Sequence, residues 1–256
     1  MNRTSKMNHD TLTMTGRCLK LSARNIDTFL TCLILPVLMM ILFVYVLGGA
    51  MNVGNASYVN YIVPGIILQC IGQCASTTAI TVNHDLRSGI IDRFCTLPIR
   101  HASVLSGHVC SAVLRNLLTT GIVILAALAV GFRPSAQIWD WLIVFMIVLL
   151  YILAISWISV YLGLRASSAE GAGAYAVFAV VLPYLSSGFA PTETMPKLMR
   201  MFAEHQPMTP MIESMRALLL GETVNTATLF LAFAWCLGLS LFFYVLSRRA
   251  FRKRIK

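Results

Sequence analysis

Two groups of sulfur-bearing side chains are the first candidates for chemistry in this sequence. Cys70 and Cys74 lie one helical turn apart, a spacing that can place two thiolates on one metal ion. The stretch 195–215 is rich in methionine and contains His205, and thioethers suit Cu(I). No third ligand lies near the cysteines, so we expect both groups to fill apolar helix faces instead. The methionines expected to pack in short re-entrant helices are Met199, Met208, Met211 and Met215.

A polar stripe is the second candidate. It consists of residues spaced four apart, which therefore share one face of a helix. Polar side chains avoid lipid, so this face should contact protein or a watery path. The stripe either lines a translocation path or supplies hydrogen bonds between helices. Its members are Gln69, Gln73, Thr77 and Thr81.

No residue set for catalysis stands out. The sequence shows neither paired carboxylates nor a Ser/His/Asp set. It also lacks the Gly-x-x-x-x-Gly-Lys-Ser/Thr run that cradles nucleotide phosphates. We therefore expect no enzyme activity and no cofactor in this chain.

The elements that must position these residues are membrane helices. Hydrophobic residues make up 57% of the 256 positions and charged residues only 12%, far from the composition of a soluble domain. A span needs roughly 20 apolar residues in a helix. The sequence thus predicts an all-α polytopic membrane protein. Its six expected spans are 29–51, 58–82, a part of 102–130, a part of 138–164, 171–189 and 226–246.

The basic residues orient these spans. With both termini inside, the inner segments carry 15 Lys and Arg residues and the outer segments carry four. Basic residues concentrate on the cytoplasmic side of membrane proteins, so both termini are expected in the cytoplasm. The remaining one, Arg115, lies within the third apolar run. We expect its side chain to extend toward the inner interface, whereas a buried functional arginine is the second interpretation.

Three regions follow along the chain. Residues 1–28 form a cytoplasmic segment in which basic and apolar residues interleave over 12–27, which predicts an amphipathic helix on the inner leaflet. Residues 29–248 form the transmembrane domain, and residues 249–256 form a basic cytoplasmic tail. The net charge of +10 matches topology and anionic lipids rather than nucleic-acid binding, because no soluble basic module is present.

The connection between the second and third spans, 84–100, is longer than a tight inner loop requires. Its apolar residues lie at helical spacing, with charged residues beside them. Such a helix can bury its apolar face in a groove of a partner while its charges fix the register. The apolar set is Leu86, Ile90, Ile91 and Phe94.

This connection resembles the cytoplasmic loop of ABC-2 type permeases, the membrane subunits of bacterial exporters for drugs, polyketides and polysaccharides. The family's acidic residue, glycine, acidic-Arg pair and proline recur here in order, with Asp where the family often has Glu. The aromatic-x-x-Pro-Gly stretch at 61–65 and the outer loop at 185–209 are also similar. The matching residues are Asp85, Gly89, Asp92, Arg93 and Pro98, with Arg87 between them.

The resemblance implies an ABC-2 type exporter fold, in which 84–100 is a coupling helix seated on a separate ATPase subunit that binds ATP and Mg²⁺. Its coupling residues would be the six just named. The daunorubicin-exporter type is the most similar subgroup, and it implies export of a drug-like, amphiphilic or lipid-like substrate from the bacterial plasma membrane. Six spans make half of such an assembly, so a second permease copy, identical or related, is expected.

Alternatives remain open. A permease for polysaccharides or lipid-linked glycans has the same architecture. A secondary transporter would act without an ATPase, but the spans lack the acidic residues that proton relays usually use. A membrane enzyme would need a carboxylate or metal cluster at one membrane face.

Overall fold

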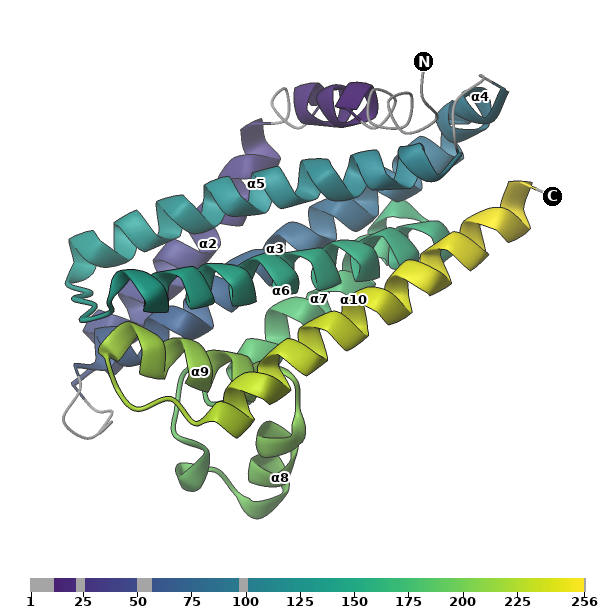
Figure 1. Cartoon of the computed structure of the whole chain (residues 1–256). Helices are drawn as coiled ribbons and strands as arrows, with labels where there is room; N and C mark the ends of the chain where they lie inside the picture. Colours follow the sequence, from purple (N-terminus) through teal and green to yellow (C-terminus); the bar gives the residue numbers. More distant parts are fainter. Residues whose placement is uncertain (1–11, 22–25, 50–56, 97–100, 256) are drawn as a thin grey trace.

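The computed structural model describes residues 12–21, 26–49, 57–96 and 101–255. It is almost entirely helical, and the described residues contain no strand. The first described helix covers residues 12–21 and has no label in Figure 1. The remaining helices in chain order are α2 (Ile26–Leu42), the π-helical η1 (Phe43–Leu47), α3 (Tyr58–Arg87), α4 (Ile90–Thr96), α5 (His101–Val130), α6 (Ile138–Arg165), α7 (Ala169–Val181), the 3-10 helices η2 (Leu182–Leu185) and η3 (Thr192–Thr194), α8 (Lys197–His205), α9 (Met208–Leu220) and α10 (Thr226–Ile255).

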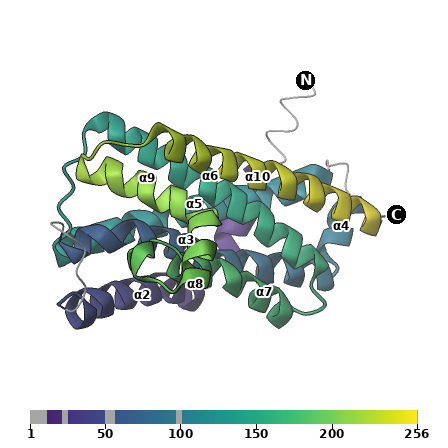
Figure 2. The same cartoon turned by 90° about the horizontal axis from the view of Figure 1, so that it is seen from below.

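Helix α3 is the central element of the bundle. It packs on α2, α5, α6 and α7, while α10 packs along α6. Figure 2 accordingly shows α10 at one edge and α2 and α7 at the other, with α3 and α6 between them. The burial of α3 explains its composition. In the most apolar 18-residue stretch of this helix, 72% of the residues are buried inside the protein. The helix therefore tolerates polar residues that a lipid-facing helix would exclude.

The bundle has two ends. One, called here the α4 end, holds α4 and the carboxyl end of α10, and the other, the α9 end, holds α8 and α9 (Figure 1). A large apolar core fills the bundle, and a smaller one at the α4 end joins Leu86 and Ile91 to Leu105, Leu164 and Phe251.

Within the part of the chain that the structure describes, five helices are long and apolar enough to cross a membrane. The fifth expected span, 171–189, instead forms a shorter apolar helix, Ala169–Leu185, in which α7 tightens into η2. Ser168 begins this helix by accepting the Gly171 N–H at 3.0 Å. Pro183 then lies at the start of η2, where the α-helical hydrogen-bond pattern ends.

Other boundaries differ from expectation at the α4 end. Helix α3 continues to Arg87, five residues past the expected end of the second span, and α10 continues to Ile255. Hydropathy identifies where apolar residues end, and a helix can continue beyond that point through polar residues. In α10 the added residues include several Arg and Lys, which are good helix formers. The expected amphipathic helix 12–27 is also shorter, because Asp27 already belongs to α2.

Methionines fill the α9 end largely as expected. Met208, Met211 and Met215 are at most 2% exposed. Met199 does not follow this pattern, because its side chain on α8 is 44% exposed. Arg216 on α9 links α9 to the start of α3 and to the segment after η2, because it donates to the carbonyl oxygens of Tyr61 and Ser187 at 3.1 and 2.6 Å.

Candidate functional site

The N-terminal helix joins the bundle at the α4 end through a partly buried ion pair. Arg17 donates from Nη1 and Nη2 to the two carboxylate oxygens of Asp85, at 2.7 and 3.1 Å. Asp85 is 3% exposed, near the end of α3. The carboxylate raises the pKa of the Arg17 guanidinium through these hydrogen bonds. A two-point contact of this kind fixes orientation as well as charge.

His108 completes the cluster from α5. Its Nε2 lies 3.4 Å from Asp85 Oδ2, and its Nδ1 lies 3.7 Å from the Cys18 sulfur. The N-terminal helix also approaches α5 closely, because a Cβ built at Gly107 would lie 2.6 Å from the Cβ of Met14. The amphipathic helix therefore packs its buried face on protein, whereas the sequence predicts contact with the lipid surface. Only some apolar side chains, such as Leu12 at 73% exposure, are left outside.

The predicted coupling segment is two helices rather than one. Helix α3 ends at Arg87, and the chain turns at Gly89, whose φ of +70° is readily adopted only by glycine among the common residues. Helix α4 then begins at Ile90. Because of this break, Leu86 at the end of α3 and Ile91 at the start of α4 face the same core. Leu86 is 8% exposed and Ile91 is 1% exposed.

Two of the four apolar residues of this segment, Leu86 and Ile91, are thus covered by the chain itself, whereas Ile90 and Phe94 stay partly exposed. Whether a partner covers those two stays a prediction. Phe94 lies under Arg17, with the guanidinium carbon 5.2 Å from the ring centroid. The exposed residues are polar: Arg87 and Arg93 both point to the surface. The backbone of Asp92 belongs to α4, but its side chain lies outside the described part, and so does Pro98.

The residues of the polar stripe on α3 differ in burial along the helix. Gln69 is fully buried, and neither its amide nitrogen nor its amide oxygen has a hydrogen-bond partner among the described residues. Thr77 lies 3.5 Å from the Cys32 sulfur of α2, and Thr81 donates to the Thr77 carbonyl at 2.8 Å. Gln73 is half-buried. The stripe's role as a translocation path stays a prediction.

Comparisons with known proteins decide the family. The family model described as ABC-2 type transporter matches residues 9–220. A daunorubicin resistance ABC transporter permease of Streptomyces coeruleorubidus is 27% identical over 222 residues, which cover 86% of this chain and 78% of that protein. A probable doxorubicin resistance ABC transporter permease of Mycobacterium tuberculosis is 29% identical, covering 84% of this chain and 78% of that protein.

The chain belongs to the ABC-2 type transporter family. Its helical bundle with several apolar, membrane-length helices agrees with a membrane transport subunit. The resemblance drawn from the loop residues between α3 and α5 is confirmed. The matched region extends from the N-terminal helix to the end of α9 and so includes the Arg17–Asp85 pair.

Arg115 is a residue of this ABC-2 family member whose position differs from expectation. It is 8% exposed and donates from Nη2 to the Thr78 hydroxyl at 2.6 Å and to the Cys74 carbonyl at 3.3 Å. The expected extension toward the interface is therefore wrong. A neighbouring helix offers acceptors within reach, so the guanidinium binds them instead of reaching water.

The sequence alone did not group Arg17, Asp85 and His108. These residues stand on three helices, and no spacing relates them. One signal was available in the sequence: Asp85 lies near the end of the helix that carries the polar stripe. A carboxylate buried there requires a cationic partner, so its presence could have predicted an ion pair but not the partner. The N-terminal segment holds several basic residues, and only the structure selects Arg17 among them.

Proposed function

We propose that this chain is the membrane-spanning permease subunit of an ATP-binding cassette exporter for drug-like, amphiphilic molecules. The observation that carries the proposal is the family match over most of the chain, together with relatives named as a daunorubicin and a probable doxorubicin resistance ABC transporter permease. ATP would be hydrolysed by a separate subunit, since the sequence contains no phosphate-binding Gly-rich run. A second permease copy would complete the transmembrane assembly.

In this proposal α7 with η2 is the sixth membrane span, and the α4 end faces the cytoplasm of a bacterium. The carboxyl end of α10 supports this orientation, because Arg248, Arg249, Arg252 and Lys253 all lie there. The Arg17–Asp85 pair lies at the same end and can share in transmitting force from the cytoplasm.

The coupling surface in this proposal is polar. Arg87 and Arg93 are exposed beside Gly89, and Asp92 lies on the same short helix. A partner with complementary charge would fix the register of α4. Movement of α4 would be transmitted through Ile91 to the core at the α4 end, and through Asp85 and Arg17 to the N-terminal helix. Helix α3 would then carry it across the membrane.

Co-purification and transport test this proposal. The chain would be co-expressed with an ABC-type ATPase subunit, and ATP-driven daunorubicin uptake would be measured in inverted vesicles. We expect the wild-type pair to co-purify and transport, and the variant Asp92→Ala/Arg93→Ala to lose most transport. Arg249→Ala, an exposed arginine on α10, is the matched control and should transport normally.

Two results would contradict the proposal. Transport by this chain alone, driven by an ion gradient, would identify a secondary transporter. Unchanged partner binding and unchanged ATP-coupled transport in Asp92→Ala/Arg93→Ala would show that coupling occurs elsewhere.

A further inference from the structure

The carboxyl end of α10 carries a cluster of basic side chains without acidic neighbours in the sequence. Arg248, Arg249, Arg252 and Lys253 lie within two helical turns, and residues 223–256 contain no Asp or Glu. The ion pairs between arginine and a carboxylate that the described residues form lie on other helices. No ion pair within the described part of the chain therefore neutralises this cluster, which needs an anion from outside it.

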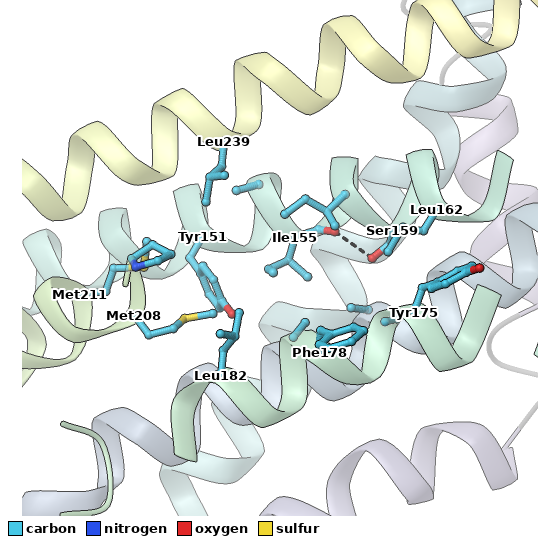
Figure 3. A pocket seen from close by; sticks show the side chains of 16 residues that line it. Tyr151, Ile155, Ser159, Leu162, Tyr175, Phe178, Leu182, Met208, Met211 and Leu239 are labelled. Carbon is cyan, nitrogen blue, oxygen red and sulfur yellow. Dashed lines mark hydrogen bonds between the residues drawn. The ribbon is translucent and has the colours of Figure 1, made fainter. Parts of the chain in front are cut away.

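A surface hollow of about 180 Å³, called here the α10 hollow, lies beside the cluster. Three arginines line it, together with Tyr244 and Val245. A second hollow of about 200 Å³, between α6, α7 and α10, is drawn in Figure 3, and no charged residue is among those that line it. Of the two, the α10 hollow is therefore the one that suits an anionic group.

Arg248 is oriented at this hollow by aromatic contacts. It donates from Nη1 to the Tyr244 hydroxyl at 3.0 Å, and its guanidinium carbon lies 5.4 Å from the centroid of that ring. The Tyr244 ring packs edge-on against Trp157 of α6, with the centroids 4.8 Å apart. Because a hydroxyl oxygen is not an anion, the contact with Tyr244 orients the guanidinium and leaves its charge unbalanced.

The position of these arginines along α10 places them at the membrane surface. At 1.5 Å per residue, the uncharged stretch 226–247 is about 33 Å long, and the hydrocarbon core of a bilayer is about 30 Å thick. Arg248 and Arg252 are about 6 Å apart along the helix axis, and each headgroup layer is about 5–8 Å thick. Both guanidinium groups therefore fall in the headgroup layer, the level at which Trp and Tyr also concentrate.

The same face of α10 is apolar on the membrane side of the arginines. Leu241, Val245, Arg248 and Arg252 follow one another at steps of three or four residues and so form one stripe. Leu241 is 65% exposed and Val245 is 37% exposed, so this chain leaves the apolar part of the stripe largely uncovered. Arg249 also borders the hollow, but it lies about 100° around the helix from Arg248 and outside the stripe.

The order of chemistry along the stripe indicates the occupant. A molecule that lies along it meets apolar side chains first and two cations next, which matches the acyl chain and the phosphate of a phospholipid. An acidic protein surface would match the cations alone. The volume also fits: a cavity of about 150 Å³ holds a benzene molecule, so the α10 hollow has room for a phosphate with its adjoining glycerol carbons.

We propose that Arg248 and Arg252 bind the phosphate of an anionic phospholipid whose acyl chain lies along Leu241 and Val245, with Tyr244 orienting the first arginine. Groups of Lys and Arg directly beyond a membrane span attract anionic headgroups in general, and the α10 hollow adds a defined place for one of them. The site is independent of the exporter function and requires that α10 crosses the membrane.

Lipid titration followed by native mass spectrometry tests the site. The full chain in detergent would be titrated with phosphatidylglycerol and with phosphatidylcholine of the same acyl chains, which differ in net charge. We expect the wild type to bind phosphatidylglycerol more tightly. One basic residue near an anionic surface contributes about fivefold to binding, so Arg248→Gln/Arg252→Gln should weaken the Kd of phosphatidylglycerol about tenfold or more.

The matched control is Arg165→Gln/Lys253→Gln. It removes two exposed charges from the same end of the bundle, and neither residue lines the α10 hollow. The control should bind phosphatidylglycerol nearly as the wild type does. Equal losses in the two double variants would show that the lipid responds to overall charge, and the site would be wrong.

Two further measurements separate a lipid from other occupants. Inorganic phosphate should not displace phosphatidylglycerol, because it lacks the acyl chain; displacement would identify a site for soluble phosphate instead. Arg248→Gln/Arg252→Gln should still co-purify with the ATPase subunit and keep the wild-type oligomeric state. If this variant bound the lipid normally but lost the ATPase subunit or changed its oligomeric state, the cluster would be a protein interface and the lipid site would be overturned.

Discussion

Arg17 and Asp85, which are 68 positions apart in the sequence, form a two-point ion pair that fastens the N-terminal helix to the end of α3. Asp85 is almost fully enclosed, whereas the Arg17 side chain keeps 28% exposure. This asymmetry predicts different effects for the two partners. Loss of the arginine leaves a buried carboxylate with His108 alone, while loss of the carboxylate leaves an arginine that can reach water.

The first prediction concerns attachment of the N-terminal helix. Breaking a buried pair costs about 3–5 kcal/mol, and the partial exposure of Arg17 reduces this to about 1–3 kcal/mol. Arg17→Ala should therefore speed amide hydrogen exchange of residues 12–21 about fivefold or more in nanodiscs. Lys20→Ala, on the exposed face of the same helix, is the control. Equal exchange in Arg17→Ala and the wild type would mean that the pair does not hold the helix.

The second prediction concerns Arg115. In a double-mutant cycle, Arg115→Met and Thr78→Val should show a coupling of about 1 kcal/mol, the range found for hydrogen bonds between membrane helices. Unfolding by SDS in detergent micelles measures each free energy. Thr120 is buried on the same helix as Arg115, and its hydroxyl has no partner among the described residues. Arg115→Met paired with Thr120→Val should therefore show coupling near zero, and a coupling equal to that of Thr78 would contradict the assignment.

The class of fold and the family could be predicted from the sequence. What could not be predicted was mainly which side chains of different helices contact each other. Apolar periodicity identified Leu86, Ile90, Ile91 and Phe94 as one apolar face. It did not show that the chain's own residues, Leu105 and Phe251 among them, cover Leu86 and Ile91. The hydrophobic effect is non-directional, so the same pattern of apolar residues is compatible with burial in a partner's groove and with burial in the chain's own core.

The polar residues show the same limit. Asp85 was identified as a loop residue of the family pattern. Its contact with Arg17 depends on how α2 and α3 fold back on each other, because together they bring the end of α3 next to the helix 12–21. Arg115 was expected to reach the interface because the hydropathy of its own helix carries no information about Thr78 on another helix. Side-chain pairs between helices depend on how the helices pack, and they cannot be recognised from a single sequence.

The third prediction tests close packing of α3 on α7. A Cβ at Gly72 would lie 2.8 Å from the carbonyl carbon of Ala179 and nearer still to its oxygen. Backbone does not move aside easily, so Gly72→Ala should lower the free energy of unfolding by about 1–3 kcal/mol. Gly121→Ala on α5 has no neighbour within 4 Å and should be neutral or stabilising by about 0.5–1 kcal/mol. Equal stability of the two variants in detergent would show that α7 does not pack this closely.

The last prediction separates coupling from stability at Gly89. Its φ of +70° costs a residue with a Cβ about 1–2 kcal/mol, although the space around it is open. Gly89→Ala should therefore redirect α4 instead of unfolding the bundle. In the reconstituted complex we expect several-fold less daunorubicin transported per ATP hydrolysed, with a melting temperature lowered by only about 2–8 °C.

Asparagine provides the matched comparison, because it adopts positive φ more readily than alanine does. Gly89→Asn should recover most of the transport per ATP that Gly89→Ala loses, even though its side chain is larger. Gly238→Ala on α10, another glycine with open space around it, should behave as the wild type does. If Gly89→Asn were as impaired as Gly89→Ala, added side-chain bulk would be the cause, and the left-handed turn between α3 and α4 would have no part in coupling.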